Sequence, residues 1–346
     1  MTTTVLGNEA AAYTPLADSA RPRIGFLGVG WIGLNRMSSL VESGLVDAVA
    51  IADPSAEMLA RAVEAAPGAQ VAADLDALLA MGVDGVVIAT PSAMHASQSI
   101  KALERGVAVF CQKPLGRTAE EVQRVIDAAR AADRLLGLDM SYRFTEAMAR
   151  VREAVTSGEL GKIYAVDLVF HNAYGPDKPW FYDRTQSGGG CVVDLGIHLV
   201  DLALWTLGFP EVENVSSKLF CEGRQLGARP EAVEDYALAT LELQGGTAVQ
   251  LACSWRLQAG CDAMISAAFY GTNGGAALRN ESGSFYDFVA ERYRGTARER
   301  LASPGDAWGG RAAIDWAGKL ATGGRFDAQA DEFARVARVL DTIYGR

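Results

Sequence analysis

The chain has no cluster of basic residues, and its charge balance is acidic. Its 346 residues include 32 lysines and arginines against 42 aspartates and glutamates, a formal net charge of −10. A nucleic-acid surface needs clustered cations to neutralise phosphates, and no run of lysine or arginine provides one. We therefore expect no nucleic-acid partner.

Cysteine and histidine are scarce. The five cysteines form an odd set without a CxxC pair, which in a chain of this length favours reduced thiols over a disulfide framework or a zinc site. We therefore expect a cytoplasmic protein without a metal centre. Only three histidines occur, His95, His171 and His198, so any chemical role for an imidazole falls to one of them.

Long apolar runs are absent too. No stretch approaches the ~18–20 uninterrupted apolar residues that a membrane span needs, and the first 20 residues lack the pattern of a secretory signal. We expect no membrane association. The length and a hydrophobic content of 49% favour two domains with cores of their own. We expect a flexible tail over 1–20, a first domain over 21–145 and a second domain over 146–346.

Strands and helices alternate in the first domain. Short apolar strands are predicted at 24–27, 46–52, around 71, and at 85–89, 107–111 and 135–138, and helices are predicted between them. Strands separated by helices of this length indicate a parallel sheet covered on both faces. The expected fold is a doubly wound α/β domain of the Rossmann type.

A glycine-rich loop follows the first predicted strand. Gly28, Gly30 and Gly33 have GxGxxG spacing between a strand and a helix, and Asp53 ends the next strand. This context predicts a dinucleotide site, in which Gly28 allows a tight turn, Gly30 admits the pyrophosphate and Gly33 lets the helix pack closely. Ordinary turn chemistry is the alternative explanation for these glycines.

The carboxylate of Asp53 indicates which cofactor to expect. It can accept hydrogen bonds from both hydroxyls of the adenine ribose but would repel a 2′-phosphate, which favours NAD over NADP. A turn-opening role before Pro54 is the alternative. The candidate cofactor contacts in this region are Gly28, Gly30, Trp31, Ile32, Gly33 and Asp53.

Lys113 lies directly after a predicted strand and before Pro114, which disfavours a helical backbone at the lysine. Its side chain is then expected at the carboxyl end of the sheet, where ligands of open α/β sheets bind. An ammonium group there could stabilise the alkoxide that develops from a substrate hydroxyl. The alternative is a solvated surface lysine.

A second chemical pair lies on an apolar helix predicted over 191–207, after a run of glycines. Asp194 and His198 are four residues apart and so share one face of that helix. A carboxylate beside an imidazole favours its charged form, which suits a base that accepts a proton near neutral pH. The alternative is a histidine packed in the core, the usual fate of a lone histidine on an apolar helix.

The alternation of strand and helix stops in the second domain. Strands are predicted at 163–172, 215–221, 236–243, 248–255 and 263–270. They indicate an α+β domain with a large, mostly antiparallel sheet that leaves one face open. A final amphipathic helix over 333–343 is expected to pack back on one of the domains. We expect a homodimer or homotetramer that covers the open face.

These motifs together resemble the Gfo/Idh/MocA family of oxidoreductases, which includes inositol dehydrogenases and glucose–fructose oxidoreductases. The similarity covers nearly all of the chain from Arg23. It rests on Gly28 to Gly33, Asp53, Thr90-Pro91 with His95, Lys113-Pro114, Tyr142-Arg143-Phe144, the run from Gly188 through Asp194 and His198 to Asp201, and Gly271 to Gly274.

The resemblance implies a catalytic trio that also binds the substrate. His198 would be the general base, Lys113 would polarise the hydroxyl and help to position the cofactor, and Asp194 would bind substrate. It also implies a cis peptide bond between Lys113 and Pro114. In addition, Arg143 would lie at the edge of the substrate pocket.

The same resemblance implies further cofactor contacts. Thr90, Pro91 and His95 would lie near the nicotinamide ribose. Gln112 is also a candidate contact, and it departs from the family pattern, which usually has Glu at this position. That departure concerns the local cofactor contacts and leaves the catalytic trio unaffected.

An aromatic segment precedes the glycine run. Tyr174, Trp180, Phe181 and Tyr182 lie on a predicted loop, where aromatic faces suit the apolar side of a sugar ring. We take Trp180 as a candidate substrate contact. A cluster that packs only on its own domain is an equally weighted alternative.

The sequence therefore predicts an NAD-dependent oxidoreductase. It would move a hydride between the nicotinamide and a secondary carbinol carbon of a sugar, a sugar derivative or a cyclitol. Two alternatives remain open: a glycosidase that uses NAD in a transient redox cycle, and a non-catalytic NAD-responsive regulator that would not need the trio.

Overall fold

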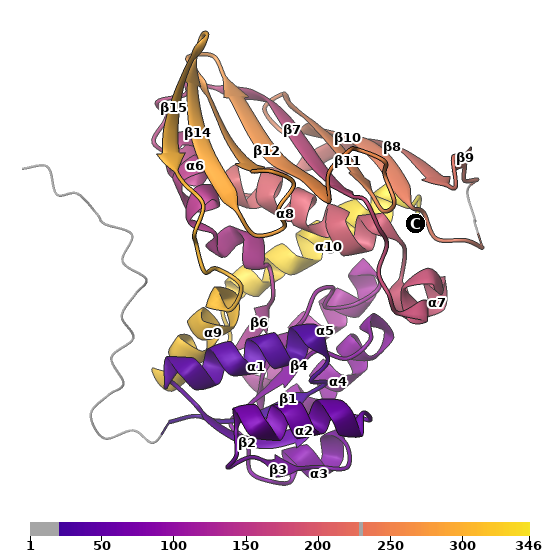
Figure 1. The fold of residues 1–346 in the computed structure, drawn as a ribbon, viewed down its shortest axis with the longest axis vertical. Helices are drawn as coiled ribbons and strands as arrows, with labels where there is room; N and C mark the ends of the chain where they lie inside the picture. Colours follow the sequence, from indigo (N-terminus) through magenta and orange to yellow (C-terminus); the bar gives the residue numbers. More distant parts are fainter. Residues whose placement is uncertain (1–20, 228–230) are drawn as a thin grey trace, which may run out of the picture.

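Two sheets organise the protein, one in the lower and one in the upper part of Figure 1. The computed structural model describes residues 21–227 and 231–346. The expected tail over 1–20 lies outside the described residues.

The first sheet is fully parallel, as the alternation of strands and helices predicts. Its order is β3-β2-β1-β4-β5-β6, so the direction of winding reverses at β1. In such sheets the ligand crevice lies at the carboxyl ends of the strands at this reversal. The strands are β1 (Arg23–Leu27), β2 (Asp47–Ala52), β3 (Gln70–Val71), β4 (Gly85–Ile88), β5 (Ala108–Cys111) and β6 (Leu136–Leu138). The helices between them are α1 (Trp31–Ser43), α2 (Ala56–Ala65), α3 (Leu75–Leu79), α4 (Ser92–Glu104) and α5 (Ala119–Ala132).

The second sheet is mostly antiparallel and has the order β15-β14-β13-β12-β7-β11-β10-β8-β9. Its one parallel pair is β7 with β11, near the centre. The strands are β7 (Ile163–Asn172), β8 (Val212–Cys221), β9 (Arg224–Gln225), β10 (Tyr236–Leu243), β11 (Thr247–Ser254), β12 (Ala263–Gly271), β13 (Gly275–Asn280), β14 (Phe288–Arg294) and β15 (Ala297–Ala302).

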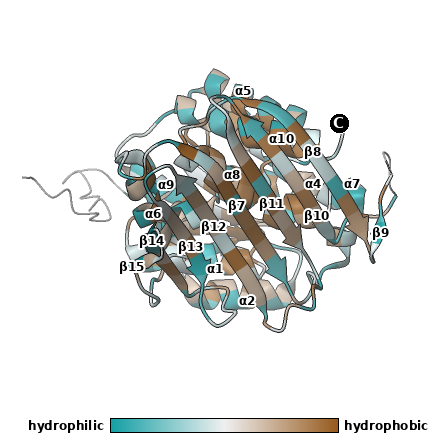
Figure 2. Cartoon of the chain, turned by 90° about the horizontal axis from the view of Figure 1, so that it is seen from above, coloured by the Kyte–Doolittle hydropathy of each residue, from teal (hydrophilic) through white to brown (hydrophobic). Residues whose placement is uncertain are grey.

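Helices line one face of this second sheet. Seen from above in Figure 2, the strands lie in front and the helices behind them. Along β10 buried residues alternate with more exposed ones, so one face is packed and the other is not covered by the described residues. The helical segments are η1 (Ser141–Phe144), α6 (Glu146–Thr156), η2 (Pro179–Tyr182), α7 (Arg184–Ser187), η3 (Val192–Gly196), α8 (Ile197–Thr206), α9 (Arg311–Ala321), η4 (Ala328–Ala330) and α10 (Asp331–Ile343).

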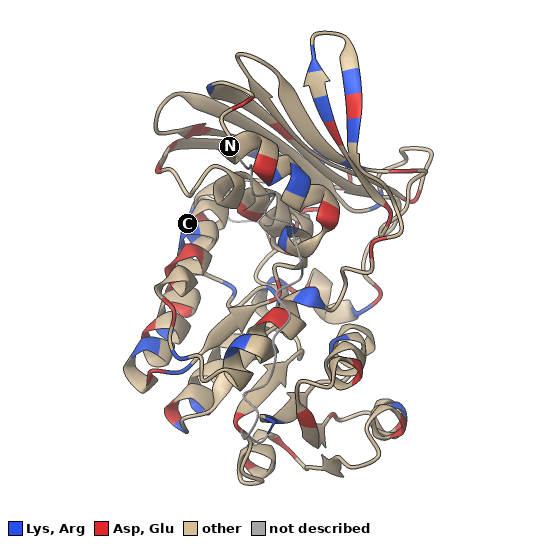
Figure 3. Ribbon diagram, turned by 90° about the vertical axis from the view of Figure 1, so that its left-hand side faces the viewer, with Lys and Arg blue, Asp and Glu red and all other residues tan. Residues whose placement is uncertain are grey.

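Strands β13, β14 and β15 were not among the predicted elements. Arg and Glu alternate along the hairpin of β14 and β15, which carries bands of both charges in Figure 3. The two strands are joined by cross-strand ion pairs such as Arg292 to Glu299, at 2.6 Å. They therefore lack the alternating apolar residues from which strands are predicted. Charged side chains on β15 also protect this edge of the sheet from pairing with another chain.

Helix α9 belongs to the core of the first sheet although it follows the second sheet in the sequence. Its Trp316 packs against Phe110, with ring centroids 5.8 Å apart. A Cβ on Gly85 or Gly137 would lie 2.7 or 2.8 Å from the Trp316 ring, so both glycines make room for it. The final helix, α10, packs on α5 and α8 and so joins the two halves of the protein.

One helical stretch of the described chain, Arg184–Thr206, is long and apolar enough to cross a membrane by length and composition alone. Its most apolar window is 94% buried inside the protein. That burial is the property of a core helix, and this helix carries Asp194 and His198.

Candidate active site

The glycine loop between β1 and α1 has the geometry of an anion site. Gly28 has a φ of +83°, which other residues rarely adopt. A Cβ on Gly33 would lie 2.1 Å from the carbonyl oxygen of Gly28, so α1 can pack this closely only because the side chain is missing. A Cβ on Gly30 would meet no protein atom within 4 Å, so this glycine leaves space free at the helix N-terminus. The arrangement fits the pyrophosphate of a dinucleotide.

Asp53 holds this loop from the end of β2. Its Oδ2 accepts the N–H of Val29 at 2.8 Å, and its Oδ1 accepts the N–H of Ser55 at 2.8 Å. Each carboxylate oxygen keeps a second lone pair, which could accept a ribose hydroxyl. Beside the loop, Trp31 is 73% exposed and Ile32 is half-buried.

His95 connects the loops that follow β4 and β5. Its ring nitrogens lie 2.6 Å from the carbonyl oxygens of Pro114 and Thr90, and the residue is only 1% exposed. Burial lowers the pKa of His95, against the effect of the hydrogen bonds to Pro114 and Thr90. These contacts favour a role for His95 in fixing the two loops over direct contact with the cofactor.

Gln112 is buried beneath the same loop, and the structure explains why an amide replaces a carboxylate there. Its Nε2 donates to Oδ2 of buried Asp139, which also accepts Nε of Arg36 at 2.6 Å. A glutamate at position 112 would place a second negative charge against Asp139. The Gln112 Oε1 in turn accepts the N–H of Lys113 at 3.2 Å. Gln112 therefore orients the backbone of Lys113.

Lys113 and Asp194 meet across the two domains. The Lys113 Nζ donates to Oδ1 and to the main-chain oxygen of Asp194, both at 2.7 Å. The indole Nε1 of Trp255 donates to the other carboxylate oxygen at 3.0 Å. The peptide bond between Lys113 and Pro114 is cis, as the resemblance implied. The structure thus brings together two members of the predicted trio and adds Trp255, which the sequence patterns did not identify.

His198 is buried beside this pair and is 6% exposed. Its ring packs against the edge of Tyr142, with centroids 4.8 Å apart, and its Nδ1 has no hydrogen-bond partner among the described residues. Burial, and after it the charges of Lys113 and Arg36, lower the pKa of His198 well below its ordinary value. The expectation that Asp194 raises this pKa is wrong, because that carboxylate is bound by Lys113. The neutral imidazole that results is the form that accepts a proton.

The helix that carries Asp194 and His198 is not regular. A π-helical turn, η3, contains Asp194, and the α-helix α8 begins at Ile197, so the two side chains lie on either side of the junction. A single π-helical turn inside a helix is frequent at functional sites. A π-helical turn changes the angle between residues four apart. Spacing along the sequence therefore does not predict where the Asp194 carboxylate lies relative to His198.

Arg143 lies in a separate buried ion-pair network. Its guanidinium donates to both carboxylate oxygens of Asp201, at 2.8 and 2.6 Å, and to Glu332 at 2.9 Å. Asp201 is 1% exposed. The network ties η1 to α8 and α10, and these contacts favour a structural role over the expected place at the edge of the substrate pocket.

The aromatic segment before the glycine run packs onto the Trp255 side of the trio. Trp180 stacks on Phe181 with centroids 3.8 Å apart. Phe181 and Tyr182 in turn meet the Trp255 ring edge-on, at 6.3 and 5.6 Å. An aromatic surface therefore runs from η2 to the residue that binds Asp194.

Comparison with known proteins identifies the family. Residues 22–140 match the oxidoreductase family with an NAD-binding Rossmann fold, and residues 148–277 match the Gfo/Idh/MocA C-terminal domain. The chain belongs to the Gfo/Idh/MocA family. Its first domain has the NAD-binding Rossmann fold of this oxidoreductase family, as the glycine loop and Asp53 predict.

Several relatives of this Gfo/Idh/MocA protein have known names. It is 31% identical to D-glucoside 3-dehydrogenase of Escherichia coli over 214 residues, which span 58% of this chain and 60% of that protein. It is 31% identical to inositol 2-dehydrogenase of Leifsonia xyli over 252 residues, which span 71% and 70% of the two chains.

Solved structures share the fold. Levoglucosan dehydrogenase, in complex with NADH and levoglucosan, has a TM-score of 0.79 at 21% identity, with 94% of this chain and 96% of that chain covered. An aldose–aldose oxidoreductase from Caulobacter crescentus has a TM-score of 0.81 at 20% identity, with 94% and 97% covered.

Two glycine substitutions separate cofactor binding from folding. Gly30→Ala adds a methyl group that meets no protein atom, so we expect an unchanged melting temperature but NAD binding weaker by about tenfold or more. Gly33→Ala forces a clash with the Gly28 carbonyl and should cost roughly 1–3 kcal/mol of stability. Calorimetric titration with NAD and thermal melts measure both. Full NAD affinity in Gly30→Ala would contradict the assigned site.

The buried histidines make stability depend on pH. The folded-state pKa of His198 lies below its ordinary value of 6.5, so the unfolded chain takes up the proton first as the pH falls. The stabilisation is complete above pH 6.5 and is lost below it, by about 1 kcal/mol for one histidine over one pH unit. We expect urea unfolding at pH 7.5 and 5.5 to show a smaller difference for His198→Asn, which stays neutral, than for the unmodified protein. Equal differences in both proteins would contradict the lowered pKa.

Proposed function

We propose that this protein oxidises or reduces one secondary carbinol carbon of a sugar, a sugar derivative or a cyclitol, with NAD as the hydride carrier. The observation that carries the proposal is the buried imidazole of His198, with its lowered pKa, beside the ion pair of Lys113 and Asp194. A neutral imidazole beside a fixed ammonium can accept the proton of a hydroxyl whose oxygen the ammonium stabilises.

Each member of the trio has a separate chemical role. In the oxidative direction neutral His198 accepts the hydroxyl proton, and the Lys113 ammonium stabilises the negative charge that develops on the oxygen. Asp194, held by Lys113 and Trp255, keeps acceptor capacity and orients the substrate through its hydroxyl groups. NAD, which the glycine loop and Asp53 would hold, would supply the hydride acceptor for the carbinol carbon.

The aromatic surface beside the trio and the names of the relatives both support the proposed substrate class. The aromatic surface from Trp180 to Trp255 suits the apolar face of a sugar ring or of a group attached to it. The names of the relatives, a glucoside dehydrogenase and an inositol dehydrogenase, point to the same class of polyhydroxylated ring. The presence of all three trio residues disfavours a non-catalytic regulator.

The uncovered face of the second sheet leads us to propose a homodimer or homotetramer. An exposed sheet of this size needs a cover, and a second copy of the chain supplies one by symmetry. We also place the protein in the cytoplasm, since all five of its cysteines are free thiols.

A panel of free sugars, inositols and glycosides tests the proposed function. We expect steady NADH formation with at least one member, and a loss of turnover by a factor of about 10² to 10⁴ in Lys113→Ala and His198→Ala, because each removes a group that acts on the reacting oxygen. NAD binding should be largely retained in His198→Ala.

Two results would overturn the assignment. Normal turnover by either variant would exclude the trio as the catalytic group. Release of free sugar from a glycoside without net NADH would indicate the glycosidase alternative instead. Arg335→Ala serves as a control for the effects of substitution and purification on turnover, because Arg335 lies on α10 and pairs with exposed Glu211.

A further inference from the structure

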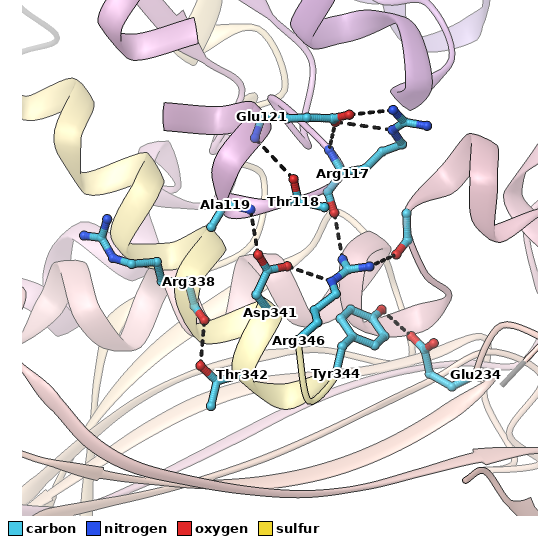
Figure 4. A network of polar contacts seen from close by, with 11 residues as sticks. Arg117, Thr118, Ala119, Glu121, Glu234, Arg338, Asp341, Thr342, Tyr344 and Arg346 are labelled. Atoms are coloured by element: carbon cyan, nitrogen blue, oxygen red, sulfur yellow. Dashed lines mark hydrogen bonds and ion pairs between the residues drawn. The ribbon is translucent and has the colours of Figure 1, made fainter. Parts of the chain in front are cut away.

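The side chain of Arg346 lies among Arg117, Asp341 and Tyr344, as Figure 4 shows. The Arg346 guanidinium donates to the carbonyl oxygen of Arg117 at 2.7 Å and to that of Gly188 at 3.1 Å. Arg117 follows Lys113 in the loop after β5, and Gly188 precedes Asp194 in the glycine run. One side chain therefore joins the loop of Lys113 to the segment that leads into η3.

Arg346 is itself held in place by α10. Its Nε donates to Oδ1 of Asp341 at 2.8 Å, and Oδ2 of Asp341 accepts the N–H of Ala119 at 2.8 Å, at the start of α5. A third link runs from Arg117 Nη1 to the carbonyl oxygen of Thr185. The same small region thus contains several hydrogen bonds between segments that are far apart in the sequence.

Glu234 fixes the other side of the glycine run. It is 2% exposed, and its Oε1 accepts the N–H groups of Gly190 and Val192 at 3.0 and 2.9 Å. The hydroxyl of Tyr344 donates to the same oxygen at 2.7 Å. A Cβ on Gly190 would lie 1.9 Å from the main-chain oxygen of Glu234, so the two segments are in direct contact. Glu234 caps the turn that contains Asp194.

The cost of burying Glu234 indicates that its position matters. Burial raises the pKa of this carboxyl, against the effect of the hydrogen bonds from Tyr344 and from the main chain. A buried carboxylate is costly unless its lone pairs are satisfied, and a well-packed apolar residue is often no less stabilising. An apolar residue, however, could not accept hydrogen bonds from the two main-chain N–H groups at the start of η3.

We propose that Arg346 and Glu234 are positioning residues, which together hold the loop after Lys113 and the turn before Asp194 at the separation that the trio needs. The proposal rests on the assignment of that trio. Neither residue is expected to touch substrate or cofactor. They affect the reaction by setting the distance between Lys113, on one domain, and Asp194 and His198, on the other.

The pKa of His198 reports on this distance and can be measured without any substrate. The charge of Lys113 contributes to the lowered pKa of His198, so a looser loop should let that pKa rise. With only three histidines in the chain, NMR can follow each imidazole, and His198→Asn assigns the signal. We expect Arg346→Ala to raise the pKa of His198 by at least about 0.5 pH unit, because Lys113 moves away.

Matched variants separate positioning from general loss of structure. Arg335→Ala, on the same helix, removes an ion pair with exposed Glu211 and should leave the His198 titration unchanged. Glu234→Gln keeps an acceptor oxygen for Gly190 and Val192 and should resemble the unmodified protein, whereas Glu234→Leu and Tyr344→Phe should shift the pKa. If Glu234→Leu fails to fold, Arg346→Ala and Tyr344→Phe still decide the matter. A His198 titration in Arg346→Ala identical to that of the unmodified protein would overturn the proposal.

Turnover provides the second readout. On the sugar that the panel selects, Arg346→Ala should lower kcat by about tenfold or more with little change in NAD affinity, because small misplacements of reacting groups are costly. Arg346→Lys should restore part of the loss. Unchanged kcat in Arg346→Ala would count against the positioning role alone, whereas unchanged kcat in His198→Ala would count against the proposed function.

Discussion

The ion pair between Lys113 and Asp194 is the interaction on which the rest of the site depends. It joins a loop of the Rossmann domain to a helix of the second domain, over 2.7 Å, with both side chains largely buried. Charge-assisted hydrogen bonds of this kind set geometry as well as energy. A hydrogen bond from Trp255 supports Asp194, and one from the Lys113 N–H to Gln112 fixes the backbone of Lys113. The loop at the carboxyl end of β5 and the helix of His198 thus meet at one point.

Burial, and after it the charge of Lys113 in this ion pair, lowers the pKa of His198. With Asp194 engaged by Lys113, the imidazole has a cation and a dry environment around it, and both favour its neutral form. A neutral base beside a fixed ammonium is the combination that withdraws a hydroxyl proton and stabilises the oxygen left behind. The helix is apolar enough to resemble a membrane span because it lies in the core, and that burial lowers the pKa of His198.

The sequence predicts features that a short segment specifies by itself. The structure adds features that depend on contacts between residues far apart in the sequence. The glycine loop, Asp53 and Lys113 before Pro114 could be found because strand, turn and helix follow each other directly. The bond from Trp255 to Asp194 joins residues 61 positions apart, so no spacing reveals it. Helix α9 and strands β13 to β15 were missed because the hairpin of β14 and β15 pairs charges, and because α9 packs on a sheet far back in the chain.

The most direct test of the central claim follows the hydride itself. The sugar or cyclitol that the enzyme oxidises is prepared with deuterium on the carbinol carbon and incubated with NAD. The account predicts that mass spectrometry of the NADH will show one deuterium per molecule, and that His198→Ala will form almost none. NADH without deuterium, or deuterium returned to the sugar with no net NADH, would contradict it.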